Sequence, residues 1–504
     1  MRVLFLPHSL RTDFFTGLIQ RLREDEGWRF SIVADEQGRK FYSRFLISED
    51  DYLGPPDFSR PTPVDSETEQ QKKIEKLIEE CERITGIPAS RVLLTGERDI
   101  GRTFGKGHYY YQGSALAAAA CRSPQASQII LRRIFHFADS ALDDLKPDLI
   151  LAGHNAHFTH LVICMCAAVR GIPVVFNRMS KIASGRAYWT ANVDLFNERS
   201  RSLFKEMRAE GKQPSEQAIA RLKECVEAPK TVQHVAQRWQ SAGATSIFKA
   251  HTRFALLAAS RLNRFLHGRK GLPVPVLPRL YNYYRMGLLK VLQRKFFSSI
   301  QAEELKSRKY VYLALHKEPE LAINLQAPGW RNQKNLIAML SAALPFGYEL
   351  LVREHRFNLG RRGSDYYRVI SNYPNVVMVD ALDDQFKYVQ NADLVVTENG
   401  STGWEGLLFG KPVLCLAESF YSHGGLGQRV SDPSDIGQTM IEMLLEQRPD
   451  TPERNRILGL MLDAEFRTTA HDETKNYSQS IDLLKDLLAD TSVTENKNLT
   501  TGRG

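Results

Sequence analysis

The stretch ADLVVTENGSTGWEGLLFGKPVLCLA, residues 392–417, shows several local patterns in succession. The apolar run 392–398 is rich in the β-branched residues that favour a buried strand. A polar turn with Gly-rich composition follows at 399–403, and 402–409 has the pattern of a helix. A second apolar run covers 411–417. We therefore predict a strand, a loop, a helix and a parallel strand, since parallel neighbours need such a crossover.

The same alternation extends toward the N-terminal side of this stretch. It predicts strands at 309–316, 348–355 and 375–380, and helices at 334–343, 363–371 and 383–390. Strands that alternate with helices at this spacing are typical of a mostly parallel, doubly wound sheet. The second half of the chain is therefore expected to be a Rossmann-like α/β domain.

The first half of the chain repeats the pattern. Strands are predicted at 2–7, 29–34, 91–95, 148–154 and 172–177, and the apolar residues near 14–27 and 159–171 have helical spacing. A chain of 504 residues is too long for one hydrophobic core. We predict an α/β fold with two Rossmann-like doubly wound domains, at 1–195 and 306–490, a helical basic insertion at 196–305 and an unfolded tail at 491–504.

Composition indicates a globular protein of the cytoplasm. Hydrophobic residues make up 43% of the chain and charged residues 25%, and no apolar run approaches the roughly 20 residues of a membrane span. The six cysteines form no CxxC motif, which favours reduced thiols. The N-terminal apolar run is too short for a secretory signal and predicts a strand instead.

Positive charge is concentrated in one segment. Between Ala228 and Ala302 there are 13 Lys and Arg and no Asp or Glu, and the rest of the chain carries 54 basic against 58 acidic residues. From 249 to 296 these cations alternate with apolar side chains, a pattern that favours binding to an anionic membrane surface. The alternative is a solvated basic face that packs on the acidic remainder. No nucleic-acid-binding motif is present, so nucleic acid is not an expected partner.

The polar turn at 399–403 has the composition of an anion-binding loop. In open α/β sheets, ligands bind beyond the carboxyl ends of the strands, next to helix N-termini. Gly400 allows close approach of a phosphate, Ser401 and Thr402 offer hydroxyls, and Glu405 is placed to accept hydrogen bonds from a ribose diol. The alternative is that Ser401 or Thr402 only caps the helix, with Glu405 as its capping-box partner.

Two further strand ends carry polar side chains. In VREHRFNLGRRG, residues 352–363, Arg353 and His355 are candidates for contact with a donor phosphate, and two more arginines add positive potential. The first strand of this domain is followed by His316 and Glu320, which are expected to face the gap between the domains. Each histidine has a simpler interpretation as a structural hydrogen-bonding residue.

The order of these motifs resembles the capsule and surface polysaccharide biosynthesis family, which is related to the bacterial Kdo and sialic acid transferases of GT-B fold. The stretches that carry the resemblance are YVYLALHKEPEL, LPFGYELLVREHRFNLGRR, YPNVVMVD and ADLVVTENGSTGWEGLLFGKPVL, within about 309–421. The similarity is weaker at 95–111 and absent across 196–305.

The resemblance implies a transferase whose second domain binds a nucleotide sugar. The family's Lys-x-His-Pro motif places its His on the donor phosphate, and His355 takes that position here, with Arg353 in place of the Lys and Arg356 in place of the Pro. Gly400, Ser401 and Thr402 are similar to the loop that holds the same phosphate. The implied donor is a nucleotide sugar, with a CMP-linked sugar as one possibility, and the implied acceptor is a surface glycan or glycolipid at the inner membrane.

Catalysis in a GT-B enzyme uses His, Arg, hydroxyls and helix dipoles on the departing phosphate instead of a metal. No convincing Asp-x-Asp motif occurs, since Asp143 and Asp144, like Asp383 and Asp384, are adjacent on predicted helices. We therefore predict transfer without a metal or other cofactor.

The first domain should supply the group that activates the acceptor. Glu97 and Asp99, which follow the predicted strand 91–95, are the first candidates, and His154, His8 and Asp13 are the reserves. The alternative for Glu97 and Asp99 is pairing with nearby arginines or capping of a turn. His154, His157 and His160 have a spacing that could suggest a metal site, but scattered polar residues at a turn are the simpler explanation.

Two other functions fit the same architecture. A nucleotide-sugar epimerase would need several acid or base carboxylates and no separate acceptor. A non-catalytic, membrane-associated component of polysaccharide assembly or export would have no affinity for nucleotides.

Overall fold

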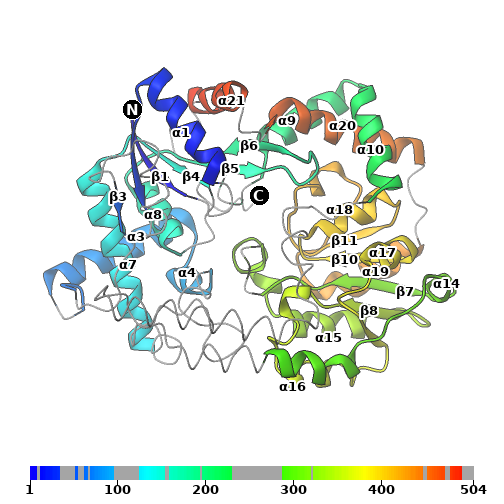
Figure 1. Ribbon diagram of the computed structural model, residues 1–504. Coiled ribbons are helices and arrows are strands. Elements are labelled where there is room, and N and C mark those ends of the chain that lie inside the picture. The colour runs from blue at the N-terminus through cyan, green and yellow to red at the C-terminus, as the bar shows by residue number, and fades with distance from the viewer. Residues whose placement is uncertain are drawn as a thin grey trace, which may run out of the picture. The chain divides into compact units, whose positions relative to one another are not determined.

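The computed structural model describes most of the chain, within which two compact units are distinguished (Figure 1). The described residues are 1–7, 12–33, 52–54, 62–65, 68–95, 124–153, 158–192, 194, 196–229, 286–318, 320, 322–445, 451–471 and 477–490. The first unit contains the described residues up to Met207 and from Leu462 onward, and the second contains those from Arg208 to Met461.

The first unit is built on a seven-stranded sheet in the order β13-β6-β5-β4-β1-β2-β3. Its strands are β1 (Arg2–Leu6), β2 (Arg29–Val33), β3 (Tyr52–Leu53), β4 (Leu149–Ala152), β5 (Val174–Met179), β6 (Arg186–Thr190) and β13 (Ala470–His471). Pairing is parallel from β5 to β3 and antiparallel for β6 and β13. The central strands are almost entirely apolar, as expected for parallel strands that are covered on both faces.

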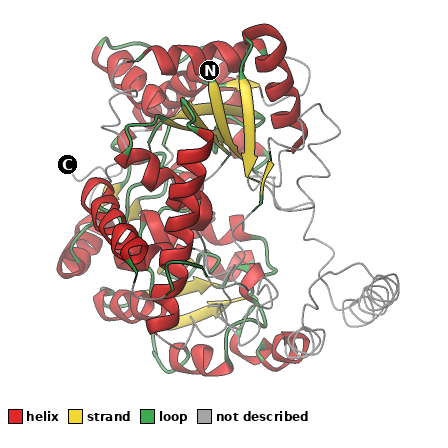
Figure 2. Cartoon of the chain, turned by 90° about the vertical axis from the view of Figure 1, so that its left-hand side faces the viewer, coloured by secondary structure: helices red, strands yellow, loops and turns green. Residues whose placement is uncertain are grey.

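Helices cover the first sheet, as the red ribbons around the yellow strands show (Figure 2). The helices of this unit are α1 (Thr12–Glu26), α3 (Glu69–Thr85), α4 (Ala89–Thr95), α7 (Pro124–Leu145), α8 (Phe158–Val169), α9 (Glu198–Ala209), whose last two residues fall in the second unit, and α21 (Ser478–Ala489). Helix α8 is apolar on nearly all sides and ten of its residues are buried, which is the behaviour of a helix enclosed by its neighbours.

The second unit has a six-stranded, entirely parallel sheet in the order β12-β11-β10-β7-β8-β9. Its strands are β7 (Tyr310–Ala314), β8 (Glu349–Arg353), β9 (Val376–Val379), β10 (Leu394–Thr397), β11 (Val413–Cys415) and β12 (Gln428–Arg429). Its helices are α10 (Glu216–Glu227), α14 (Ala302–Leu305), α15 (Gln333–Ala343), α16 (Ser364–Ile370), α17 (Gln385–Asn391), α18 (Ser401–Leu408) and α19 (Ile436–Leu445). The predicted fold class, with two parallel-sheet domains, is confirmed.

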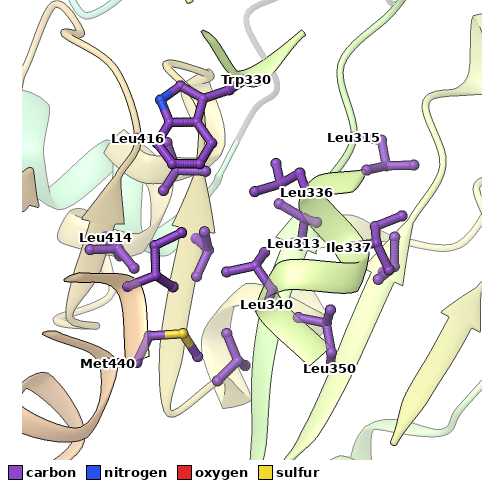
Figure 3. Close-up of a cluster of buried hydrophobic side chains, with 14 of the residues drawn as sticks. Leu313, Leu315, Trp330, Leu336, Ile337, Leu340, Leu350, Leu414, Leu416 and Met440 are labelled. Atoms are coloured by element: carbon purple, nitrogen blue, oxygen red, sulfur yellow. The ribbon is translucent and has the colours of Figure 1, made fainter. Parts of the chain in front are cut away.

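Figure 3 shows part of the core of the second unit. Leu313 on β7, Leu350 on β8 and Leu414 on β11 meet Leu336, Ile337 and Leu340 from α15 and Met440 from α19. The three leucines from the strands are fully buried. Burial of each such side chain contributes about 1.5–3 kcal/mol to the stability of the folded state. This core therefore holds in place the strand ends from which the polar loops emerge.

One predicted element is wrong. Residues 91–95 were expected to form a strand, and they belong to α4 instead. Ala89, Val92 and Leu93 are buried, at the spacing i, i+3, i+4 of one helix face. A short apolar run of this kind is compatible with either a strand or a helix. Here the helix is stabilised by its packing on α7 and α8.

The C-terminal part of the described chain belongs to the first unit, whereas the sequence analysis placed residues 306–490 in a second domain. Helix α20 (Thr451–Thr468) contains the boundary between the units, and β13 then pairs with β6. Helix α21 packs Ile481, Leu484 and Leu487 into the core of the first unit, beside Phe14 and Trp28. These contacts lie hundreds of residues apart in sequence, and no local pattern indicates them.

Candidate functional site

Three neighbouring strand ends of the second unit form the candidate site. Strands β10, β7 and β8 are adjacent and parallel, so their carboxyl ends lie at one edge of the sheet. The chain runs from β7 outward to β8 and β9 and then returns to β10 on the other side of β7. The strand order therefore reverses between β7 and β10, and in open α/β sheets such a reversal is the point where ligands bind.

The loop after β10 leads directly into the first turn of α18. Gly400 is the N-cap residue and supplies no side-chain capping bond. In the described part of the chain, neither the hydroxyls nor the backbone N–H groups of Ser401 and Thr402 have a hydrogen-bond partner. The simple capping alternative therefore does not occur. Together with the partial positive charge of the helix N-terminus, these donors are suited to an anion.

Tyr421 holds this loop in place. Its hydroxyl donates to the Gly400 carbonyl at 2.9 Å, and the Gly400 N–H donates to Thr397 Oγ1 at 2.9 Å. A Cβ atom on Gly403 would lie 1.9 Å from Tyr421 Oη. Tyr421 is fully buried, so only glycine fits at position 403.

Glu405 lies one turn further along α18 and is 6% exposed. Its two carboxylate oxygens accept from Gln385 Nε2 at 3.0 and 3.1 Å. Burial raises the pKa of Glu405 to about 7, although the nearby Arg353 works to lower it. The carboxylate thus changes charge near neutral pH. The expected contact with a ribose stays a prediction.

In the loop after β8, Arg353 and His355 have different surroundings. The Arg353 guanidinium donates to the carbonyls of Ala381 at 2.8 Å and Asp383 at 3.1 Å, which ties it to the loop before α17. His355 Nδ1 accepts from the Phe357 N–H at 3.1 Å, and burial lowers the pKa of His355. The neutral ring therefore carries its proton on Nε2, the atom that can donate to a phosphate.

The remaining arginines of this loop are engaged within the protein. Arg362 Nε lies 2.7 Å from Glu354 Oε2, and its NH1 group lies 2.9 Å from Glu318 Oε2. Arg361 stacks on the ring of Phe357, with 3.7 Å from its guanidinium carbon to the ring centroid. The two arginines that were expected to add positive potential thus hold the loop together.

The loop after β7 places His316 between two carboxylates. His316 Nε2 lies 3.5 Å from Glu398 Oε2, and Nδ1 lies 3.7 Å from Glu320 Oε2. Burial works to raise the pKa of Glu320, but the close contact with His316 outweighs it and lowers the pKa to about 2. A Cβ on Gly400 would lie 3.2 Å from His316 Nε2, so the ring borders the first turn of α18. The structure thus brings His316 and Gly400 together.

The candidates of the first domain cannot be placed in the same way. His8, Glu97, Asp99, His154 and His157 lie outside the described residues. Asp13 is exposed in the first turn of α1, and His160 is buried on α8. Their predicted roles stay predictions.

Three residues of the site were missed by the sequence analysis, namely Glu398, Tyr421 and Gln385. A charged residue at the end of the apolar run VVTE was the available signal for Glu398. Tyr421 and Gln385 belong to other elements and carried no local signal. Among the described residues, no group of three or more His, Cys, Asp or Glu side chains is arranged to hold a metal ion, and no helix has the length and apolar character needed to cross a membrane.

Comparison with known proteins gave no matching family model and no matching curated protein. Solved structures do match. UDP-GlcNAc 2-epimerase from Neisseria meningitidis, bound to UDP-GlcNAc, is 13% identical, with a TM-score of 0.24 and coverage of 96% of this chain and 100% of that chain. The β-Kdo 2,7 transferase KpsC of Thermosulfurimonas dismutans is 10% identical, with a TM-score of 0.34 and coverage of 70% and 89%.

Spinosyn rhamnosyltransferase SpnG, in complex with thymidine diphosphate, is 12% identical, with a TM-score of 0.29 and coverage of 96% and 100%. Kdo transferases, which the resemblance in sequence led us to expect, are therefore among the matching structures. Identities and TM-scores of this size carry no inference about activity.

Proposed function

We propose that the protein is a glycosyltransferase that takes a sugar from a nucleotide-sugar donor, bound by the second unit. The observation that carries the proposal is the first turn of α18. It offers backbone N–H groups and hydroxyls that have no partner within the described ranges, at the point where the strand order of the sheet reverses. Donors of this kind stabilise the phosphate of the donor and the charge that develops on it during transfer.

Neighbouring groups support a nucleotide as the ligand. His355 adds a neutral Nε2–H donor, and Glu405 is a buried acceptor one turn from the phosphate position, where a ribose diol would lie. Arg353 holds the loop before α17 in place, because its guanidinium donates to the carbonyls of Ala381 and Asp383. Transfer is proposed to need no metal, and full activity in excess EDTA is the expected result.

The acceptor is proposed to be a growing capsule or lipopolysaccharide-type glycan at the cytoplasmic face of the inner membrane. The described end of the basic segment supports a peripheral contact with anionic lipid. Leu288, Val291 and Leu292 are 60%, 61% and 52% exposed at positions i, i+3 and i+4, next to the exposed cations Arg294 and Lys295. Flotation with anionic vesicles should be lost when the three apolar residues become Ser, and the same change at the exposed Leu445 should have no effect.

The first test of donor binding is thermal stability with CMP, UDP, GDP and their sugar conjugates. A ligand at 100 times its Kd stabilises the native state by about 2.7 kcal/mol. One nucleotide should raise the Tm of the wild type, and His355→Ala should weaken the effect. His136→Ala, on α7 of the first unit, is the matched control. If no nucleotide stabilises the wild type, the proposal fails.

Two substitutions at one position separate the hydroxyl from the backbone donor. Ser401→Ala removes only the hydroxyl, whereas Ser401→Pro also removes the N–H. Proline is tolerated at the first position of a helix, and Gly400, with φ −76° and ψ 164°, has the extended conformation that a residue before proline requires. Affinity for the nucleotide should fall about tenfold or more for Ser401→Pro. Unchanged affinity would remove the first turn of α18 from the binding site.

A nucleotide-sugar epimerase is the second candidate, and the position of His316 between Glu320 and Glu398 favours it, because epimerisation needs acid and base groups. Product analysis separates the two functions. An epimerase alters the sugar of the nucleotide with no acceptor present, whereas the transferase needs an acceptor.

A further inference from the structure

Glu398 is a buried carboxylate that forms no hydrogen bond with another described residue. It is 0% exposed, and the backbone hydrogen bond that lowers its pKa comes from Glu398 itself. Its backbone is fixed, since its carbonyl accepts from the Ala417 N–H at 2.8 Å. Burying such a group costs free energy, and most buried polar groups in proteins are paired. A side chain that lowers stability in this way suggests a role in function.

The contact that Glu398 does make is with His316. Its Oε2 lies 3.5 Å from His316 Nε2, and the His316 side chain is only 10% exposed. The backbone of His316 is held on both sides, because its main-chain N–H donates to Gln333 Oε1 at 2.6 Å and its carbonyl accepts from Asn358 Nδ2 at 3.0 Å. The ring itself is flanked by Glu398 at Nε2 and by Glu320 at Nδ1. His316 thus lies between the buried carboxylate and Gly400, the residue from which α18 begins.

We propose that Glu398 is a positioning residue for His316, whose carboxylate holds the ring in this orientation and favours its protonated form, so that a nucleotide phosphate at the first turn of α18 meets a cation. The inference rests on the proposed function in that it assumes a phosphate at this position. Glu398 itself does not touch the ligand, since its side chain is fully buried. The pair of Glu398 and His316 carries one shared proton and no net charge, which limits the cost of burial.

Electrostatics of the surroundings agree with this role. Burial raises the pKa of Glu398 and the charge of His316 lowers it, as expected for two groups that compete for one proton. Further charged or titratable groups around the pair come from the loops after β7 and β8 and from α16, and they are Glu320, Lys317, Glu318, Arg362, His355 and Tyr366. Arg362 and Glu318 form an ion pair, and Glu320 lies on the other nitrogen of His316.

The decisive experiment is a pH titration of the His316 ring by NMR in the full-length protein without ligand, with the signal identified by its loss in His316→Gln. In Glu398→Gln, which keeps the size of the side chain, the pH at which the ring loses its proton should fall by about one to three units. An unchanged titration overturns the inference. Because no nucleotide is present, this result is independent of the proposed function.

Affinity for a nucleotide provides the second readout. Affinity for the nucleotide that stabilises the wild type should fall in Glu398→Gln, and more at pH 8 than at pH 6. In a His316→Gln background the same substitution should cause no further loss of affinity. Independent, additive losses from the two substitutions would overturn the inference.

Discussion

The loops after β8 and β10 lie at the same edge of one sheet, yet they use their polar groups in opposite ways. After β8, Arg353 and Arg362 are hydrogen-bonded to carbonyls and carboxylates of the protein itself. After β10, Ser401 and Thr402 leave their donors without partners among the residues that the structure describes. Charge in a sequence motif therefore does not by itself identify the binding group. The group to look for is the one that the fold leaves unsatisfied at a position where a ligand can reach it.

The largest expected effect comes from breaking the network after β8. Arg362→Ala removes both ion pairs and leaves Glu354, which is 0% exposed, without its cation. Loss of one partner from a buried pair costs about 3–5 kcal/mol, and urea denaturation should show a decrease of this size in the free energy of unfolding.

Arg368→Ala, on the exposed side of α16, is the matched control, with an expected change within about 0.5 kcal/mol. If both substitutions have the same small effect, Arg362 is not structural. It would then be available to a phosphate, and the contrast between the two loops would disappear.

A second prediction compares two buried carboxylates. Glu354 accepts from Asn358, Tyr367, Arg362 and the His355 N–H, whereas Gln385 is the only donor to Glu405 in the described part of the chain. Burial raises the pKa of Glu405 from 4.5 to about 7, so the native state binds the extra proton in this pH window and the unfolded state does not. Stability contributed by this group must therefore fall as the pH rises from 4.5 to about 7.

Urea denaturation across this pH range, for the wild type and for Glu405→Gln, measures the effect. As the pH rises from 4.5 to about 7, the free energy of unfolding of the wild type should fall by up to about 3 kcal/mol more than that of the variant. Glu442→Gln, on the exposed side of α19, should follow the wild type. Parallel curves for the wild type and Glu405→Gln would show that Glu405 is already ionised at acidic pH.

Much of the fold was predictable because it is encoded locally. The strands of the second unit are short apolar runs bounded by polar turns, and their spacing alone indicated a parallel sheet with polar loops at one edge. The Gly-Ser-Thr turn was recognisable for the same reason, since a turn, a helix start and unpaired donors all occur within a few residues.

The remaining features depend on contacts between distant parts of the chain. Arg362 pairs with Glu354 because of how the loop packs. The sequence alone is equally compatible with an Arg362 that binds a ligand. Residues 91–95 have no strong period, so their neighbours decide that they form a helix. The pairing of β13 with β6 joins residues nearly 300 positions apart, and the position of Tyr421 against Gly400 depends on how two loops meet.

The smallest expected effect concerns the shape of the loop after β10. Gly403→Ala would place its Cβ 1.9 Å from Tyr421 Oη and 2.5 Å from Cζ. The buried Tyr421 must then shift away from the Gly400 carbonyl. Overpacking of this kind costs about 1–3 kcal/mol.

Gly329→Ala is the matched control, because no atom of the described residues lies within 4 Å of the added Cβ, and it should change stability by no more than about 0.5 kcal/mol. Urea denaturation measures both variants, and nucleotide titration shows whether binding follows. If Gly403→Ala is destabilised but binds the nucleotide as the wild type does, the donors of Ser401 and Thr402 do not need this loop geometry. Preorganisation by Tyr421 would then not explain why they stay unpaired. If affinity and stability fall together only in Gly403→Ala, the tight contact between α18 and Tyr421 is what keeps these donors directed at the ligand.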